Sequence, residues 1–132
     1  MVRISPLIGG GRYVDLVLGT SVVLALLWHV AVTVLTLMPG KDIPRVDIVD
    51  FDKVAHLGAF GLMTWLYLRT RIARPWIIAS GCATYGVLIE VAQGQFTVDR
   101  QADPYDALAN AIGCFLAVLI FTRGFRVVSN GK

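Results

Sequence analysis

The chain has 132 residues, of which 56% are hydrophobic and only 16% are charged, and its formal net charge is +3. A soluble domain usually carries about 25% charged residues, and a soluble chain this short could not bury so much apolar surface in one core. The composition therefore predicts an all-α, polytopic membrane bundle that forms a single domain. No basic stripe interleaved with aromatic residues points to nucleic acid.

Four apolar segments follow one another, and each is interpreted as a transmembrane helix. The first, residues 16–38, has no formal charge over 23 residues. At ~1.5 Å rise per residue, this length crosses a ~30 Å hydrocarbon core. It is too long for the apolar region of a signal peptide, so we expect a retained anchor. The other spans are predicted at residues 53–69, 75–92 and 105–122. The second is the weakest, and a tilted or half-buried helix is its alternative.

Basic residues are distributed unevenly between the two predicted membrane faces. Eight Lys and Arg residues lie in the two terminal tails and in the loop between the second and third spans, and four lie in the other loops. Those other loops also carry most of the acidic residues. Because Lys and Arg favour the cytoplasmic side, this pattern predicts that both termini are cytoplasmic. The net charge then reflects membrane topology.

Small residues concentrate in the last three predicted spans, whereas the first is rich in Leu and Val. Small residues allow helix backbones to approach closely in a membrane. We therefore expect the second, third and fourth spans to form a core, with the first at its periphery. Cys82 and Cys114 lie within the third and fourth spans and are predicted to be unpaired, small apolar side chains.

Polar residues gather at the predicted outer ends of the second, third and fourth spans. Within each span they are spaced three, four or seven residues apart, which places them on one helical face. Since polar groups facing lipid are costly, these faces should turn toward the bundle interior or a water-filled mouth. The candidate ligand-binding residues are Lys53, Gln93, Arg100, Asp103, Asp106 and Asn110, and the candidate catalytic residues are Glu90 and His56.

Several of these residues also have a purely structural interpretation. Asp103 precedes Pro104, a pattern typical of a helix N-cap followed by proline at the first helical position. Asn110 can form an interhelical hydrogen bond, and Lys53 can extend its amine to the membrane interface. His29, in the middle of the first span, is expected to be a neutral histidine bonded to a neighbouring helix rather than a proton relay. Glu90 favours function, because acids within membranes are usually functional.

Three runs resemble, in order and spacing, the pattern of the VanZ-like family. They are DKVAHLGAFG at 52–61, YGVLIEVAQ at 85–93 and RQADPYDALANAIG at 100–113. The resemblance implies a four-helix membrane domain with the same eight polar positions and a link to the cell envelope. The expected location is the bacterial cell (inner) membrane, either a single plasma membrane or an inner membrane that faces a periplasm. The family takes its name from a member associated with resistance to the glycopeptide teicoplanin. The resemblance implies no biochemical activity.

Three functions stay open from the sequence. The first is an envelope protein whose outward-facing polar cluster binds a lipid head group or a glycopeptide-like ligand. The second is a membrane enzyme acting on a lipid-linked phosphate or sugar, with Glu90 or His56 as general base. The third is a small transporter that uses Glu90 and His29. Membrane lipids and a lipid-linked envelope precursor are the expected partners, and an oligomer is compatible with the sequence.

No cofactor is identified from the sequence, and no residue is assigned as a metal ligand. The acidic residues near the outer ends of the spans have no recognised metal-ligand spacing. Carboxylates can nevertheless hold a hard divalent cation, because such cations prefer oxygen ligands.

Overall fold

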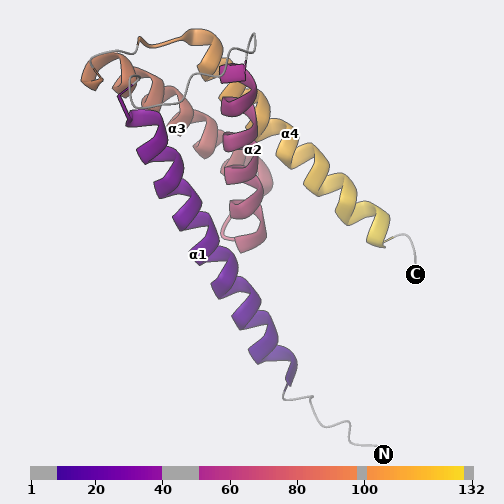
Figure 1. Ribbon diagram of the computed structural model, residues 1–132. Helices are drawn as coiled ribbons and strands as arrows, with labels where there is room; N and C mark the ends of the chain where they lie inside the picture. The colour runs from indigo at the N-terminus through magenta and orange to yellow at the C-terminus, as the bar shows by residue number, and fades with distance from the viewer. Residues whose placement is uncertain (1–8, 40–50, 98–100, 130–132) are drawn as a thin grey trace, which may run out of the picture.

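Four helices make up the fold, as the sequence predicts. The computed structural model describes residues 9–39, 51–97 and 101–129 (Figure 1). The helices are α1 (Gly9–Leu37), α2 (Phe51–Thr70), α3 (Pro75–Phe96) and α4 (Pro104–Ser129). All except α2 extend clearly beyond the predicted apolar segments, because their polar ends continue the backbone hydrogen bonding outside the apolar region.

Three of the described helices are long and apolar enough to cross a membrane, over Val14–Leu37, Pro75–Phe96 and Pro104–Gly124. The chain is therefore a multi-pass membrane protein. The remaining helix, α2, is 20 residues long and less apolar. It packs against each of the other three helices, most extensively against α4. A helix surrounded in this way presents less surface to lipid and needs fewer apolar residues.

The helices run in alternating directions and so define two ends of the bundle (Figure 1). At one end, which we call the site end, α1 and α3 end while α2 and α4 begin. The opposite end, which we call the turn end, contains the short connection from α2 to α3, the start of α1 and the end of α4. Within the described part of the chain, α1 contacts α2 and α3 but makes no contact with α4. The prediction that the first helix is peripheral is therefore confirmed.

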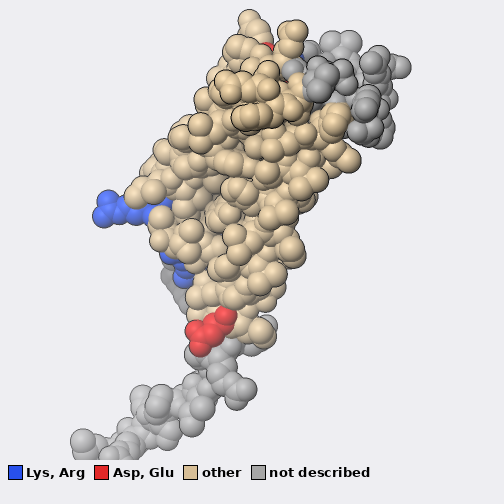
Figure 2. Space-filling model, turned by 90° about the vertical axis from the view of Figure 1, so that its left-hand side faces the viewer, with Lys and Arg blue, Asp and Glu red and all other residues tan. Residues whose placement is uncertain are grey.

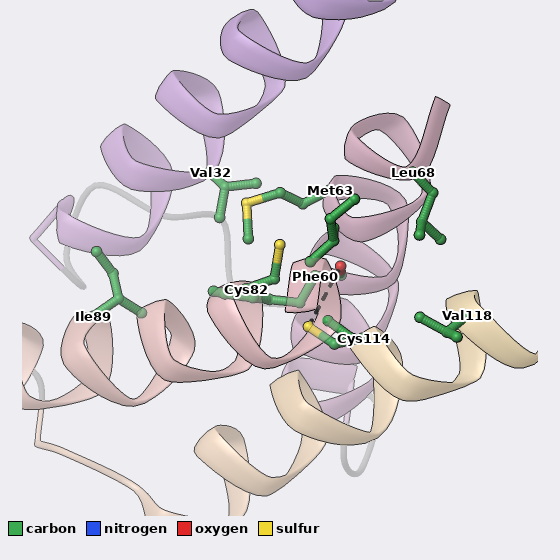
Figure 3. Packing of buried hydrophobic residues seen from close by; sticks show 10 residues of the cluster. Val32, Phe60, Met63, Leu68, Cys82, Ile89, Cys114 and Val118 are labelled. Carbon is green, nitrogen blue, oxygen red and sulfur yellow. Dashed lines mark hydrogen bonds between the residues drawn. The ribbon is translucent and has the colours of Figure 1, made fainter. Parts of the chain in front are cut away.

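The core lies between α2, α3 and α4, with α1 covering one side (Figure 3). Phe60 and Met63 of α2 are fully buried, and the Cys114 thiol lies 3.8 Å from the Phe60 carbonyl oxygen. Cys82 and Cys114 are both buried and unbridged, as predicted. The crossing of α2 and α4 is close because Gly61 and Gly113 face each other there. Small residues therefore set the helix separation, as expected in a membrane.

The outer surface is largely apolar. The face in Figure 2 is almost wholly uncharged, and its charged side chains lie mainly at the level of the α2–α3 turn and below it. Large hydrophobic residues on α1, α3 and α4 stand exposed, including Leu27, Leu88 and Ile120 at 61–63% of their full accessible surface. Such a surface suits contact with lipid, because exposing apolar side chains to lipid has no free-energy cost of the kind it has in water.

Candidate functional site

A hollow of about 370 Å³ opens at the site end of the bundle. Its lining residues come from α2, α3, the segment that leads into α4 and the first turn of α4, so residues of the three predicted polar faces do meet in space. Four of the predicted site residues line it: His56, Gln93, Asp103 and Asp106. The complete lining is Asp52, His56, Gln93, Gln101, Ala102, Asp103, Pro104 and Asp106.

His56 is the centre of this arrangement and is only 7% exposed. Its Nδ1 lies 3.0 Å from Oδ1 of Asn110, within hydrogen-bonding distance, and 3.5 Å from Oε1 of Glu90. Its Nε2 lies 3.8 Å from Oδ1 of Asp52 and 3.9 Å from Oδ2 of Asp106. One ring nitrogen is therefore held by the protein, while the other faces two carboxylates that line the hollow. The predicted interhelical role of Asn110 is confirmed.

Lys53 ties the start of α2 to the start of α4. Its Nζ lies 3.6 Å from Oδ2 of Asp103 and 3.8 Å from Oδ1 of Asp106. Lys53 and Asp103 are both partly exposed, so the ion pair between them contributes little to stability by itself. The amine nevertheless sits against acids of the cluster. It is therefore less available to an anionic ligand than the sequence alone suggests.

Asp103 begins α4 in the manner predicted. Its Oδ1 accepts the backbone N–H of Tyr105 at 2.8 Å, and Pro104 is the first helical residue. Such a cap contributes about 1 kcal/mol, and Pro costs nothing at a position whose N–H lacks an intrahelical partner. The cap also fixes the direction in which Asp106, three residues later, enters the cluster.

Glu90 is 3% exposed and joins α3 to the segment that begins α4. Its Oε2 lies 3.4 Å from the backbone nitrogen of Asp103, which donates to it, while its Oε1 accepts no hydrogen bond from the described residues. A buried carboxylate with an unsatisfied oxygen is costly unless a cation lies near it. Within the described part of the chain, the titratable His56 lies next to Glu90. Arg100, one of the candidate ligand-binding residues, lies outside the described residues.

Gln93 has a structural task in addition to lining the hollow. Its Nε2 donates to the carbonyl oxygen of Thr36 at 2.5 Å, which fastens α3 to the last turn of α1. Its backbone carbonyl also accepts both the amide and the hydroxyl of Thr97, where α3 ends. One N–H of the side-chain amide is thus used by the fold.

Four lining residues were not among the candidates from sequence: Asp52, Gln101, Ala102 and Pro104. Asp52 could have been found, because it stands four residues before His56 and shares its helical face. Gln101 and Ala102 precede α4 and follow no helical spacing. Their proximity to the cluster depends on how that segment packs against α3, where Ala102 lies beside Gly94.

The described part of the cluster carries more negative than positive charge. It holds the four acids Asp52, Glu90, Asp103 and Asp106, against Lys53 and the titratable His56. Asp106 and Asn110 also retain one side-chain atom each without a hydrogen-bond partner among the described residues. Of these two residues Asp106 lines the hollow, where its oxygen could accept a hydrogen bond from a polar ligand.

His29 lies apart from this cluster. Its Nδ1 is 3.0 Å from the hydroxyl of Tyr67 on α2, and its ring packs on Tyr85 of α3 with centroids 4.4 Å apart. The expected bond to a neighbouring helix is therefore confirmed. Tyr67 is eleven residues beyond His56 on α2, about 16 Å at the usual helical rise.

Comparison with known proteins gives one match. The model of the VanZ/LLP1 family matches residues 13–126, which include most of all four helices. VanZ, which gives the family its name, is associated with glycopeptide resistance. No curated protein and no solved structure matches the chain.

Proposed function

Because the chain belongs to the VanZ/LLP1 family of membrane proteins, we propose that it acts in the bacterial cell envelope by binding a polar head group in its hollow. The ligand is a membrane lipid, a lipid-linked envelope precursor or another amphiphile active at the envelope. The association of VanZ with glycopeptide resistance makes teicoplanin a natural probe.

The observation that carries this proposal is the position and chemistry of the hollow. Its volume of about 370 Å³ falls in the range of small-molecule sites, ~300–1,000 Å³. It opens at the end of a bundle whose sides are apolar, the level at which lipid head groups lie. A polar head would enter the hollow while its apolar chains stay against the exposed faces of the helices. Oδ1 of Asp106, which accepts no hydrogen bond from the described residues, would then gain one.

We assign the site end to the outer side of the inner membrane. What supports this orientation is the distribution of basic residues, eight of the twelve Lys and Arg residues being in segments assigned to the other side. The start of α1, the finish of α4 and the α2–α3 turn lie at one end of the bundle, as that orientation requires. Both chain termini would then be cytoplasmic.

Blocking the hollow with a bulky side chain tests the proposal. Full-length protein in detergent would be titrated calorimetrically with teicoplanin and with short-chain phospholipids that carry ethanolamine, choline or glycerol head groups. The wild type is expected to bind at least one of them. Ala102→Trp should weaken that binding by at least about tenfold, because the indole would fill the space of the ligand.

The matched control is Ala73→Trp, which adds the same side chain at an exposed position in the α2–α3 turn. It should bind as the wild type does, and circular dichroism should show both variants folded. Equal affinities for both variants would place the ligand outside the hollow. A wild type that binds none of the probes would exclude these ligand classes.

A second candidate is an enzyme acting on a lipid-linked phosphate or sugar. The observation that favours it is the state of His56, whose Nδ1 is held by Asn110 and Glu90 while its Nε2 faces the hollow. A general base is commonly oriented in this way. His56 would then contact the substrate, and Glu90, which lies behind it, would be a positioning residue.

The two candidates differ in what cells accumulate. Lipid profiles would compare cells without the protein, with the wild type and with Glu90→Gln at equal abundance. An enzyme predicts that one lipid-linked species accumulates both without the protein and with Glu90→Gln. Three coinciding profiles would leave binding as the function.

A further inference from the structure

We propose that Asp52, His56 and Asp106 form a binding site for one divalent metal ion of the class that accepts both oxygen and imidazole ligands, such as Mn²⁺ or Zn²⁺. The site lies at the wall of the hollow. Its ligands come from the first two turns of α2 and the first turn of α4. The metal site does not depend on the head-group function proposed above.

The distances suit a shared cation. One ligand atom from each of the three residues lies within 4.8 Å of the others. Nε2 of His56 is 3.8 Å from a carboxylate oxygen of Asp52 and 3.9 Å from one of Asp106. Two bonds of about 2.1 Å to one metal ion span at most about 4.2 Å, so each of these two pairs is close enough to share an ion. The spacing of Asp52 and His56, four residues apart, puts both ligands on one helical face.

The hydrogen bonding of His56 is the second observation. Its Nδ1 lies 3.0 Å from Oδ1, the side-chain amide oxygen of Asn110. If Nδ1 carries the proton and donates there, Nε2 presents a lone pair toward two carboxylates, which would repel it. A metal ion between them removes this conflict. Metal-bound histidines usually donate their other ring N–H to a carbonyl or carboxylate, and here Asn110 and Glu90 occupy that position.

The proposed ligands lie among buried carboxylates. The Asp106 side chain is 8% exposed and the Glu90 side chain 5% exposed. Oδ1 of Asp106 and Oε1 of Glu90, which are next to the proposed ligand atoms, accept no hydrogen bond from the described residues. Lys53 approaches Asp106 at Oδ1, which is not the oxygen that faces His56. Oδ2 therefore stays directed at the proposed ion. Burial of so many acceptors is best compensated by a cation.

All three ligands line the hollow, so an ion could enter from the aqueous side. Three protein ligands leave coordination positions open to the hollow. A phosphate-bearing head group would complete the coordination shell there, and this last step rests on the proposed function. The binding of the metal ion itself is independent of that function.

Direct metal binding tests the inference. Full-length protein in detergent would be stripped with a chelator and then equilibrated separately with Mn²⁺, Zn²⁺, Mg²⁺ and Ca²⁺. Bound metal would be counted by mass spectrometry, and the Mn²⁺ form examined by pulsed electron paramagnetic resonance. We expect one tightly bound Mn²⁺ or Zn²⁺ per chain and a nitrogen coupling from His56.

Asp52→Asn should weaken metal affinity at least about tenfold. Its carboxylate is 62% exposed, so the fold should survive this change even if Asp106→Asn does not fold. Asp15→Asn, an exposed acid near the start of α1, is the control and should leave the affinity unchanged. The inference is overturned if no metal binds stoichiometrically, if Asp52→Asn binds like the control, or if the bound Mn²⁺ shows no nitrogen coupling.

Discussion

Gly113→Ala is expected to destabilise the bundle by about 3 kcal/mol, the upper part of the usual range for overpacking. A Cβ at this position would lie 2.2 Å from the carbonyl oxygen of Leu57 and 3.1 Å from the backbone nitrogen of Gly61. Both are backbone atoms of α2, so no side-chain rotation can relieve the clash. The two helices with the largest shared interface would have to separate. Reversible unfolding in mixed micelles, followed by circular dichroism, measures the loss.

Gly124→Ala is the matched control because it adds the same methyl group to the same helix. A Cβ there would meet nothing within 4 Å. Since alanine is the better helix former, this variant should be as stable as the wild type or slightly more stable. If the two variants unfold alike, the close crossing of α2 and α4 is not what holds the bundle together.

Gly86→Ala is expected to disturb both stability and the site. A Cβ at Gly86 would lie 2.9 Å from Cβ of Asn110 and 3.1 Å from Cε1 of Phe60. Asn110 is fully buried and its Oδ1 faces His56, so it cannot retreat without changing that contact. We expect a loss of about 1–3 kcal/mol in unfolding free energy, together with weaker binding in the hollow.

The comparison variant for this change is Gly81→Ala, five residues earlier on α3. A methyl group at Gly81 meets open space, so its unfolding free energy should stay close to that of the wild type. Both variants would be studied by unfolding and by the calorimetric titration described above. Normal binding by a destabilised Gly86→Ala protein would show that the position of Asn110 does not control the hollow.

The fold could be predicted because its physical signals are local. A run of apolar residues long enough for the membrane predicts a helix wherever it occurs. The weaker signal of α2 reflects its central place in the bundle, where neighbours replace lipid. Helix ends were less predictable. For example, α4 continues to Ser129, well past its apolar part, since backbone hydrogen bonding does not stop where hydrophobicity does.

The site could be predicted only in part. Helical spacing predicted that the polar residues of each span share one face turned away from lipid, and the structure brings Lys53, His56, Glu90, Asp103 and Asp106 together. Spacing within one helix cannot say which residues of different helices form pairs. The contact between His56 and Asn110 depends on the crossing of α2 and α4, and thus on the glycines that permit it. The ion pairs of Lys53 with Asp103 and Asp106 could not be predicted from spacing either, since they join the starts of two different helices.

The most direct measurement would be photocrosslinking in living cells, which captures the molecule bound in the hollow. A benzophenone-bearing amino acid would replace Gln101, an exposed lining residue, or Ile72, which is 68% exposed in the α2–α3 turn. After irradiation, mass spectrometry would identify the adducts. If the hollow is the binding site, position 101 should capture one polar-headed amphiphile, enriched over its share of the membrane, and position 72 should sample bulk lipid. Adducts that follow bulk lipid composition at both positions would contradict a ligand site at this end of the bundle.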